Sequence, residues 1–116
     1  NDINALLARS ILEKAGHTVT RAINGAEALA LVREHADSDR FDFVLMDLQM
    51  PVMDGLNALD EIRKFEKQHN CNRLPVVILT ADEQGSTRSL AETTGADGFL
   101  TKPLEPARLL QMVDDI

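Results

Sequence analysis

The chain of 116 residues contains no Trp and no Tyr, and aromatic residues make up only 3% of it. Because 44% of its residues are nevertheless hydrophobic, its core must be built from aliphatic side chains. The length suits one domain with a single core. A single cysteine, Cys71, excludes an internal disulfide and argues against a zinc site built on cysteines.

Basic residues are the minority among the charged residues, with 12 Lys and Arg against 19 Asp and Glu, a net charge of −7. Nucleic acids and anionic membranes attract proteins through basic patches, so this balance argues against direct binding to either. The chain also has no run of about 18 apolar residues, the length needed to cross a membrane. A P-loop and a G-x-G-x-x-G motif are both missing, which disfavours a nucleotide-binding enzyme.

Short apolar runs alternate with helical patterns along the chain. Unbroken apolar runs of this length are typical of buried strands in a parallel sheet. The alternation predicts an α/β fold in which helices cover both faces of that sheet. We expect strands at residues 17–23, 42–47, 76–79 and 98–100. We expect helices before Gly16, at 26–35, 55–68 and 84–94, and from residue 105 onward. Asn24 and Gly25 are predicted to form a turn.

The three strongest predicted strands each lead into a reactive polar residue. The first stops at Asp47, the second stops at Thr80, and the third runs through Thr101 to Lys102. Taken singly, these could be a loop-capping acid, a β-favouring threonine and a surface lysine. Parallel strands end at the same edge, where open α/β sheets place their sites. We therefore expect a carboxylate, a hydroxyl and an ammonium group to meet there, a set suited to phosphate or a metal ion.

Prolines and a glycine restrict the loops at this edge. Pro51 stiffens the loop that follows the strand-end acid, and Gly55 permits backbone angles that other residues avoid. Such a loop can present the backbone carbonyl of Gln49 to a metal ion, and Mg²⁺ takes carboxylates, carbonyls and waters. Pro103 holds Lys102 in an extended conformation. These residues are predicted to shape the site.

Three segments together resemble the receiver domains of response regulators in two-component signalling. The segments are MDLQMPVMDG at residues 46–55, LTA at 79–81 and GADGFLTKP at 95–103. The resemblance covers nearly the whole chain. The opening residues 1–4 and the stretch 101–104 are similar to receivers attached to hybrid sensor histidine kinases.

The resemblance implies a flavodoxin-like, doubly wound parallel sheet with strand order 2-1-3-4-5. It implies transfer of a phosphoryl group from a phosphohistidine to Asp47 in a phosphorelay. Lys102 would contact the acyl phosphate, and Thr80 would close onto one of its oxygens. Phe99 matches the aromatic switch position, and the carbonyl of Gln49 would bind Mg²⁺. The last helix, the strand at 98–100 and the helix from 84 would form a switchable protein-interaction face.

Receivers also carry an acidic pair at the end of their first strand, and here that pair would stand upstream of Asn1. We therefore expect residues 1–116 to be a receiver domain that lacks its first strand, and we expect the natural protein to continue upstream. A strand exchanged from a second copy, or a homodimer, is the alternative. Without the acidic pair, metal binding would be weak.

The resemblance also implies the setting of the domain. Its partner would be a sensor histidine kinase or a histidine phosphotransfer domain, in the cytoplasm or tethered to a membrane-bound sensor kinase. The receiver itself would carry no kinase activity and contact neither nucleic acid nor membrane. The alternative function is a receiver-like interaction module that takes no phosphate. An Asp-nucleophile phosphatase is disfavoured, because Gln49 stands where those enzymes need a second acid.

Overall fold

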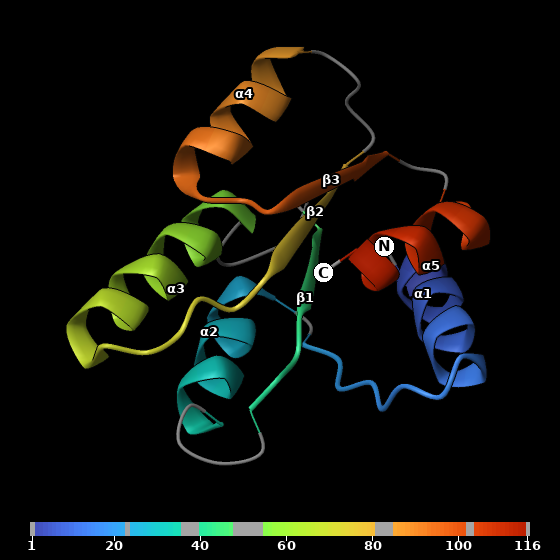
Figure 1. Cartoon of the computed structure of the whole chain (residues 1–116), viewed down its shortest axis with the longest axis horizontal. Coiled ribbons are helices and arrows are strands. Elements are labelled where there is room, and N and C mark those ends of the chain that lie inside the picture. The colour runs from blue at the N-terminus through green and yellow to red at the C-terminus, as the bar shows by residue number, and fades with distance from the viewer. Residues whose placement is uncertain are drawn as a thin grey trace.

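In the described residues of a computed structural model of the chain, three parallel strands form a sheet and five helices flank it (Figure 1). The structure describes residues 2–22, 24–35, 40–47, 55–80, 85–101 and 104–115, with backbone alone for 2–5 and 85–88. The elements in chain order are α1 (Asp2–Lys14), α2 (Gly25–Glu34), β1 (Val44–Asp47), α3 (Gly55–His69), β2 (Val76–Thr80), α4 (Gly85–Thr94), β3 (Gly98–Thr101) and α5 (Pro106–Asp115). The α/β class and the parallel sheet confirm the prediction from the sequence.

The sheet has the order β1-β2-β3, and both pairings are parallel. Val44 of β1 pairs with Val76, and Val77 of β2 pairs with Gly98. Strand β2 therefore lies between two neighbours, and all five of its residues are buried. This burial is what an unbroken apolar run predicts for an interior parallel strand.

Two aliphatic layers enclose the sheet. Side chains alternate along a strand, so Val76 and Ile78 face one layer while Val77 and Leu79 face the other. Helices α2, α3 and α4 cover the first face, and α1 and α5 cover the second (Figure 1). No aromatic side chain is among the fully buried residues of the described ranges, as the composition predicted.

The segment 17–22 is not a strand, so the prediction of a strand there is wrong for the residues described. A strand exists only through hydrogen bonds to a neighbour. Within the described ranges no segment pairs with 17–22 or with the outer edge of β1. His17, Thr18, Thr20 and Arg21 are accordingly exposed.

Glycine follows two of the helices, and the helix before Gly16 is one that the sequence predicts. Gly16 follows α1 with φ +95, and its N–H donates to the carbonyl of Glu13 while the N–H of His17 donates to that of Leu12. This pair of bonds satisfies the last carbonyls of the helix. Gly95 follows α4 with φ +120. Both values lie where a side chain would strain the backbone.

Asn24 begins α2 as its N-cap, a role that the predicted turn did not include. Its Oδ1 accepts a hydrogen bond from the backbone N–H of Glu27 at 2.8 Å. We expect Asn24→Ala to lower the free energy of unfolding by about 1 kcal/mol, because this N–H loses its partner. Urea unfolding measures the change, and Asn24→Ser should retain most of the stability. Equal losses in both variants would contradict a capping role.

Within the described residues, no helix combines the length and apolarity needed to cross a bilayer.

Candidate functional site

Two of the three polar residues at the predicted strand ends, Asp47 and Thr80, lie at the carboxyl edge of the sheet. Asp47 is the last residue of β1, and Thr80 is the last residue of β2. Asp47 pairs with Leu79, and Thr80 pairs with Thr101 at the end of β3. Neighbouring strands lie about 4.8 Å apart. The sheet therefore holds Asp47 and Thr80 at the ends of adjacent strands. Because Asp47 pairs with Leu79, Thr80 lies one residue further along its strand than Asp47 does.

Burial differs between these two residues. Asp47 is half-buried, whereas Thr80 is only 2% exposed. A buried hydroxyl without a hydrogen bond is costly. Every buried side-chain nitrogen or oxygen in the described part of the structure has a partner. The hydroxyl of Thr80 thus occupies a protected position, while the acid beside it remains accessible from the edge.

Phe99 lies on the same face of the sheet as Thr80. It pairs with Ile78, which is two residues before Thr80 and therefore points to the same side. Phe99 is half-buried and packs against the cluster formed with α2, α3 and α4. A displacement at the end of β2 can consequently reach this ring through direct neighbours on one face.

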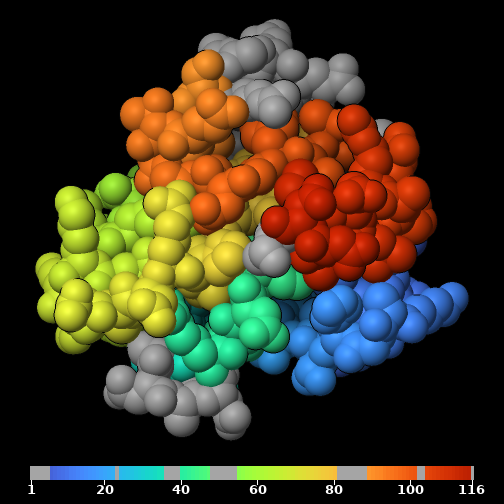
Figure 2. Space-filling model, viewed as in Figure 1, coloured from blue at the N-terminus to red at the C-terminus, as the bar shows by residue number. Residues whose placement is uncertain are grey.

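A groove of about 410 Å³ separates β3 from α5. Its walls are Phe99, Leu100 and Thr101 of β3, and Ala107, Arg108, Gln111, Met112 and Asp115 of α5. Figure 2 shows α4, β3 and α5, in orange and red, on one face of the molecule. This is the face that the sequence predicts for protein interaction, and Phe99 forms part of its surface.

Four predicted site residues lie outside the described ranges, and their roles remain predictions: Gln49, Pro51, Lys102 and Pro103. Thr101 is described, so the strand that leads directly into Lys102 is in place. Gly55 is the buried first residue of α3.

A metal ion at this edge would find one suitable donor among the described residues. A carboxylate such as that of Asp47 is a hard oxygen ligand of the kind that Mg²⁺ accepts. Within the same ranges no three His, Cys, Asp or Glu side chains are grouped so that they could hold a metal. Asp47 therefore fits as one ligand of a metal ion, and the remaining ligands would have to come from residues outside the described ranges or from water.

Sequence reasoning missed a second polar cluster, at the opposite edge of the sheet. Arg63 and Glu66 of α3 are both buried or nearly so, although they are charged. The available signal was their spacing, which places them on the helix face that also carries the fully buried Leu59 and Ile62. Their partners come from distant parts of the chain, so the contacts themselves have no local signature.

Comparison with known proteins identifies the family. A model described as "Response regulator receiver domain" matches residues 1–114. The sensor protein GacS from Pseudomonas syringae pv. syringae is 39% identical over 113 residues, 97% of this chain. Those residues are only 12% of GacS, so the chain spans about an eighth of that relative.

Solved structures agree with this match. A chain of the CheX–CheY–BeF₃–Mg²⁺ complex from Borrelia burgdorferi is similar with a TM-score of 0.88 and 27% identity, over 99% of this chain and 81% of that chain. A receiver domain of a sensor histidine kinase from Pseudomonas aeruginosa PAO1 has a magnesium ion coordinated in its active-site cleft. It matches with a TM-score of 0.84 and 29% identity, over 99% of this chain and 88% of that one.

The family match covers nearly the whole sequence. In this chain Asp47 and Thr80, at the ends of adjacent strands, lie at one edge of a parallel sheet. This chain belongs to the response-regulator receiver domain family.

Proposed function

We propose that this chain is a phosphoacceptor domain that takes a phosphoryl group from a phosphohistidine onto Asp47 in a phosphorelay. The observation that supports this most directly is the position of Asp47. Its carboxylate ends β1 at the carboxyl edge, half-buried beside the end of β2, where Thr80 lies. Membership of the receiver family makes phosphoryl uptake the reaction to expect at such an acid.

In the proposed reaction a carboxylate oxygen of Asp47 attacks the phosphorus atom of the donor. The O–P bond forms as the P–N bond to the donor histidine breaks, and the electron pair of that bond stays on the imidazole nitrogen. Phosphoryl transfer needs mainly positioning and charge neutralisation from the protein. We propose that Lys102 neutralises charge on the phosphoryl oxygens. We also propose that the Thr80 hydroxyl donates a hydrogen bond to one of them.

Mg²⁺ is the proposed cofactor, and it would supply positive charge beside the phosphoryl oxygens. Asp47, the backbone carbonyl of Gln49 and the acidic pair expected upstream of Asn1 would hold it. The magnesium ion reported in the cleft of the Pseudomonas aeruginosa receiver supports this choice of metal.

A hybrid histidine kinase is the proposed context, supported by the relative GacS, which is a sensor protein. The donor would then be the histidine kinase or a histidine phosphotransfer domain, and the kinase activity would belong to other parts of the protein. We place the domain in the cytoplasm. Residues 1–116 would form one receiver domain.

Treatment of the receiver domain, taken with the sequence that flanks it in the natural protein, with acetyl phosphate and Mg²⁺ tests the proposal. We expect the intact mass to rise by one phosphoryl group, and we expect EDTA to suppress the gain. Hydroxylamine should remove the group, because an acyl phosphate is a mixed anhydride whose acyl carbon hydroxylamine attacks, with release of phosphate. A folded protein that gains no mass would instead support the alternative function, an interaction module that takes no phosphate.

Replacement of Thr80 by Val should uncouple the switch from phosphorylation. A hydrogen bond to a charged oxygen contributes about 1.5–3 kcal/mol, so its loss should shift the active–inactive equilibrium by roughly 10- to 100-fold. We expect Thr80→Val still to gain mass with acetyl phosphate. The phosphorylation-dependent change in hydrogen exchange at residues 98–101 should be lost, and Thr80→Ser should keep it. An undiminished change in Thr80→Val would contradict the proposed role.

A further inference from the structure

All five N–H groups of the Arg63 guanidinium are used at the amino edge of the sheet. Nε and Nη2 donate to the carbonyl of Gly95 at 3.0 and 2.8 Å. Nη1 donates to the carbonyl of Leu74 at 2.8 Å and to Oε1 of Glu66 at 2.8 Å. Nη2 also donates to Oδ2 of Asp97 at 2.7 Å. A guanidinium has five such donors in a planar fork, and with 14% of the side chain exposed this one is nearly enclosed.

Three of these acceptors, Leu74, Gly95 and Asp97, lie beside the end of α4 or the starts of β2 and β3. Gly95 follows the last residue of α4, Asp97 precedes β3, and Leu74 lies two residues before β2. One side chain of α3 therefore holds the end of one helix and the approaches to two strands. On α4 itself, Ala91 is buried and Leu90 is 54% exposed.

Asp97 strengthens this connection between the two strands. Its Oδ2 also accepts a hydrogen bond from the backbone N–H of Val76 at 2.9 Å, and its own N–H donates to the carbonyl of Val76 at 2.8 Å. Arg73, which is more exposed, adds bonds to Oδ1 of Asp97 and to the carbonyl of Gly95, each at 2.9 Å. The amino ends of β2 and β3 are thus joined through both backbone and side chains.

The glycine that follows α4 favours this contact. At Gly95 a Cβ atom would lie 3.1 Å from Cγ and Nε of Arg63, and the φ of +120 already disfavours any side chain. Gly95 thereby lets the guanidinium approach the backbone carbonyl. The end of α4 and the Arg63 side chain are therefore in direct contact through the Gly95 carbonyl.

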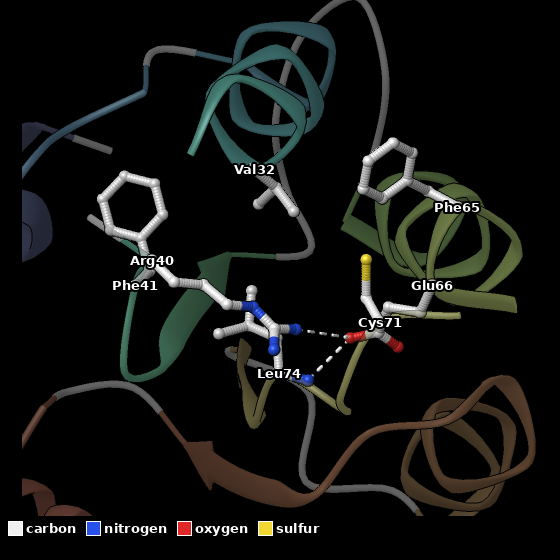
Figure 3. A pocket seen from close by; sticks show the side chains of 7 residues that line it. All are labelled: Val32, Arg40, Phe41, Phe65, Glu66, Cys71 and Leu74. Carbon is white, nitrogen blue, oxygen red and sulfur yellow. Dashed lines mark hydrogen bonds and ion pairs between the residues drawn. The ribbon is translucent and has the colours of Figure 1, made fainter. Parts of the chain in front are cut away.

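Glu66 closes the network on the side of α2 (Figure 3). Its Oε2 accepts a hydrogen bond from the N–H of Leu74 at 2.6 Å and lies 3.8 Å from Nη2 of Arg40. The adjacent cavity, which Cys71 and Phe65 help to line, has a volume of about 10 Å³. That is room for about one water molecule, so this cavity is too small for a larger ligand.

We infer that Arg63 is a positioning residue that fixes the end of α4 and the start of β3 against β2. Phe99 and Thr101 lie further along β3, toward the carboxyl edge and away from this fixed end. Arg63, Glu66, Asp97 and the Gly95 carbonyl make up what we call the Arg63 cluster. The consequence for switching rests on the proposed function: α4 and Phe99 would move about the Arg63 cluster as a pivot when Asp47 is phosphorylated.

Hydrogen exchange of the Arg63→Met chain tests the inference, with Lys64→Met as the matched control. Lys64 is the next residue of α3, is exposed, and its hydrogen bond to Asp60 raises the pKa of its ammonium group, so it too is a full cation. In Arg63→Met we expect residues 90–101 to exchange at least about tenfold faster before any phosphorylation, with α2 and β1 unchanged. Arg63→Lys should resemble Arg63→Met, because a single ammonium cannot span these acceptors. Lys64→Met should match the wild type.

Beryllofluoride with Mg²⁺ supplies the second readout. In the wild type we expect a change in exchange at 98–101 on its addition, and in Arg63→Met we expect most of this change to be lost. Equal acceleration in all elements, or an unchanged response, would overturn the inference. If Arg63→Met does not fold, Asp97→Asn, which keeps one carboxamide oxygen as acceptor, should show the same local pattern more weakly. A wild type without any beryllofluoride response would refute the proposed function, while exchange in the untreated protein would still decide the role of Arg63.

Discussion

Replacing Asp47 by Asn is expected to abolish uptake of a phosphoryl group from acetyl phosphate. The amide has nearly the shape of the carboxylate, but its oxygen is a poor nucleophile and carries no charge to bind a metal ion. Because Asp47 is half-buried at the end of a strand, the substitution should leave the sheet intact. Intact mass after incubation with acetyl phosphate and Mg²⁺ measures the result, and no phosphorylated species should be detected.

Asp42→Asn is the matched control for this experiment. Asp42 is exposed and lies two residues before β1, so it is near the opposite end of the same strand from Asp47. Its variant should gain mass as the wild type does. A phosphorylated Asp47→Asn protein would show that another side chain is the acceptor. Loss of phosphorylation in Asp42→Asn as well would show that the effect is not specific to the strand end.

Truncation of Leu59 to Ala is expected to lower the free energy of unfolding by about 2–5 kcal/mol. Leu59 has no exposed surface and packs with Met46 and Ile78 in the layer beneath α3. The truncation removes apolar contacts and leaves a cavity that the packed sheet cannot fill. Small domains are stable by only about 5–15 kcal/mol, so this single change threatens the whole fold.

Leu90→Ala provides the same chemical change at a different depth. Leu90 is 54% exposed on α4, and its truncation should change stability by no more than about 0.5 kcal/mol. Urea unfolding of the two variants and the wild type gives the comparison. Similar losses at both positions would contradict the assignment of the core to the layer that contains Leu59.

The carboxyl-edge site could be predicted from local sequence because its determinants are short-range. An apolar run such as 76–79 must be buried, and an interior parallel strand buries all its residues. Parallel strands finish at one edge, so Asp47 and Thr80 had to meet once the alternation of elements was recognised. Gly16 likewise ends the predicted first helix, where its positive φ suits a helix end.

The strand predicted at 17–23 shows where local pattern failed. Its loose alternation suits a strand, yet hydrogen-bond partners decide whether a strand forms, and among the described residues it has none. The burial of charged residues on α3 could not be predicted from the sequence for a similar reason. Glu66 is 7% exposed although glutamate usually lies at the surface, because Arg63 and the backbone of Leu74 supply its partners.

The sequence by itself determined the α/β class, the parallel sheet and the acid and hydroxyl at its carboxyl edge. These follow from hydrophobic periodicity, which acts over a few residues. Only the tertiary structure decided which charges are buried at the amino edge. Arg63 reaches Gly95 and Asp97 across more than thirty residues of chain, and no local pattern encodes the geometry of that contact. Packing brought those groups within hydrogen-bonding distance, and their mutual satisfaction is what allows them to be buried.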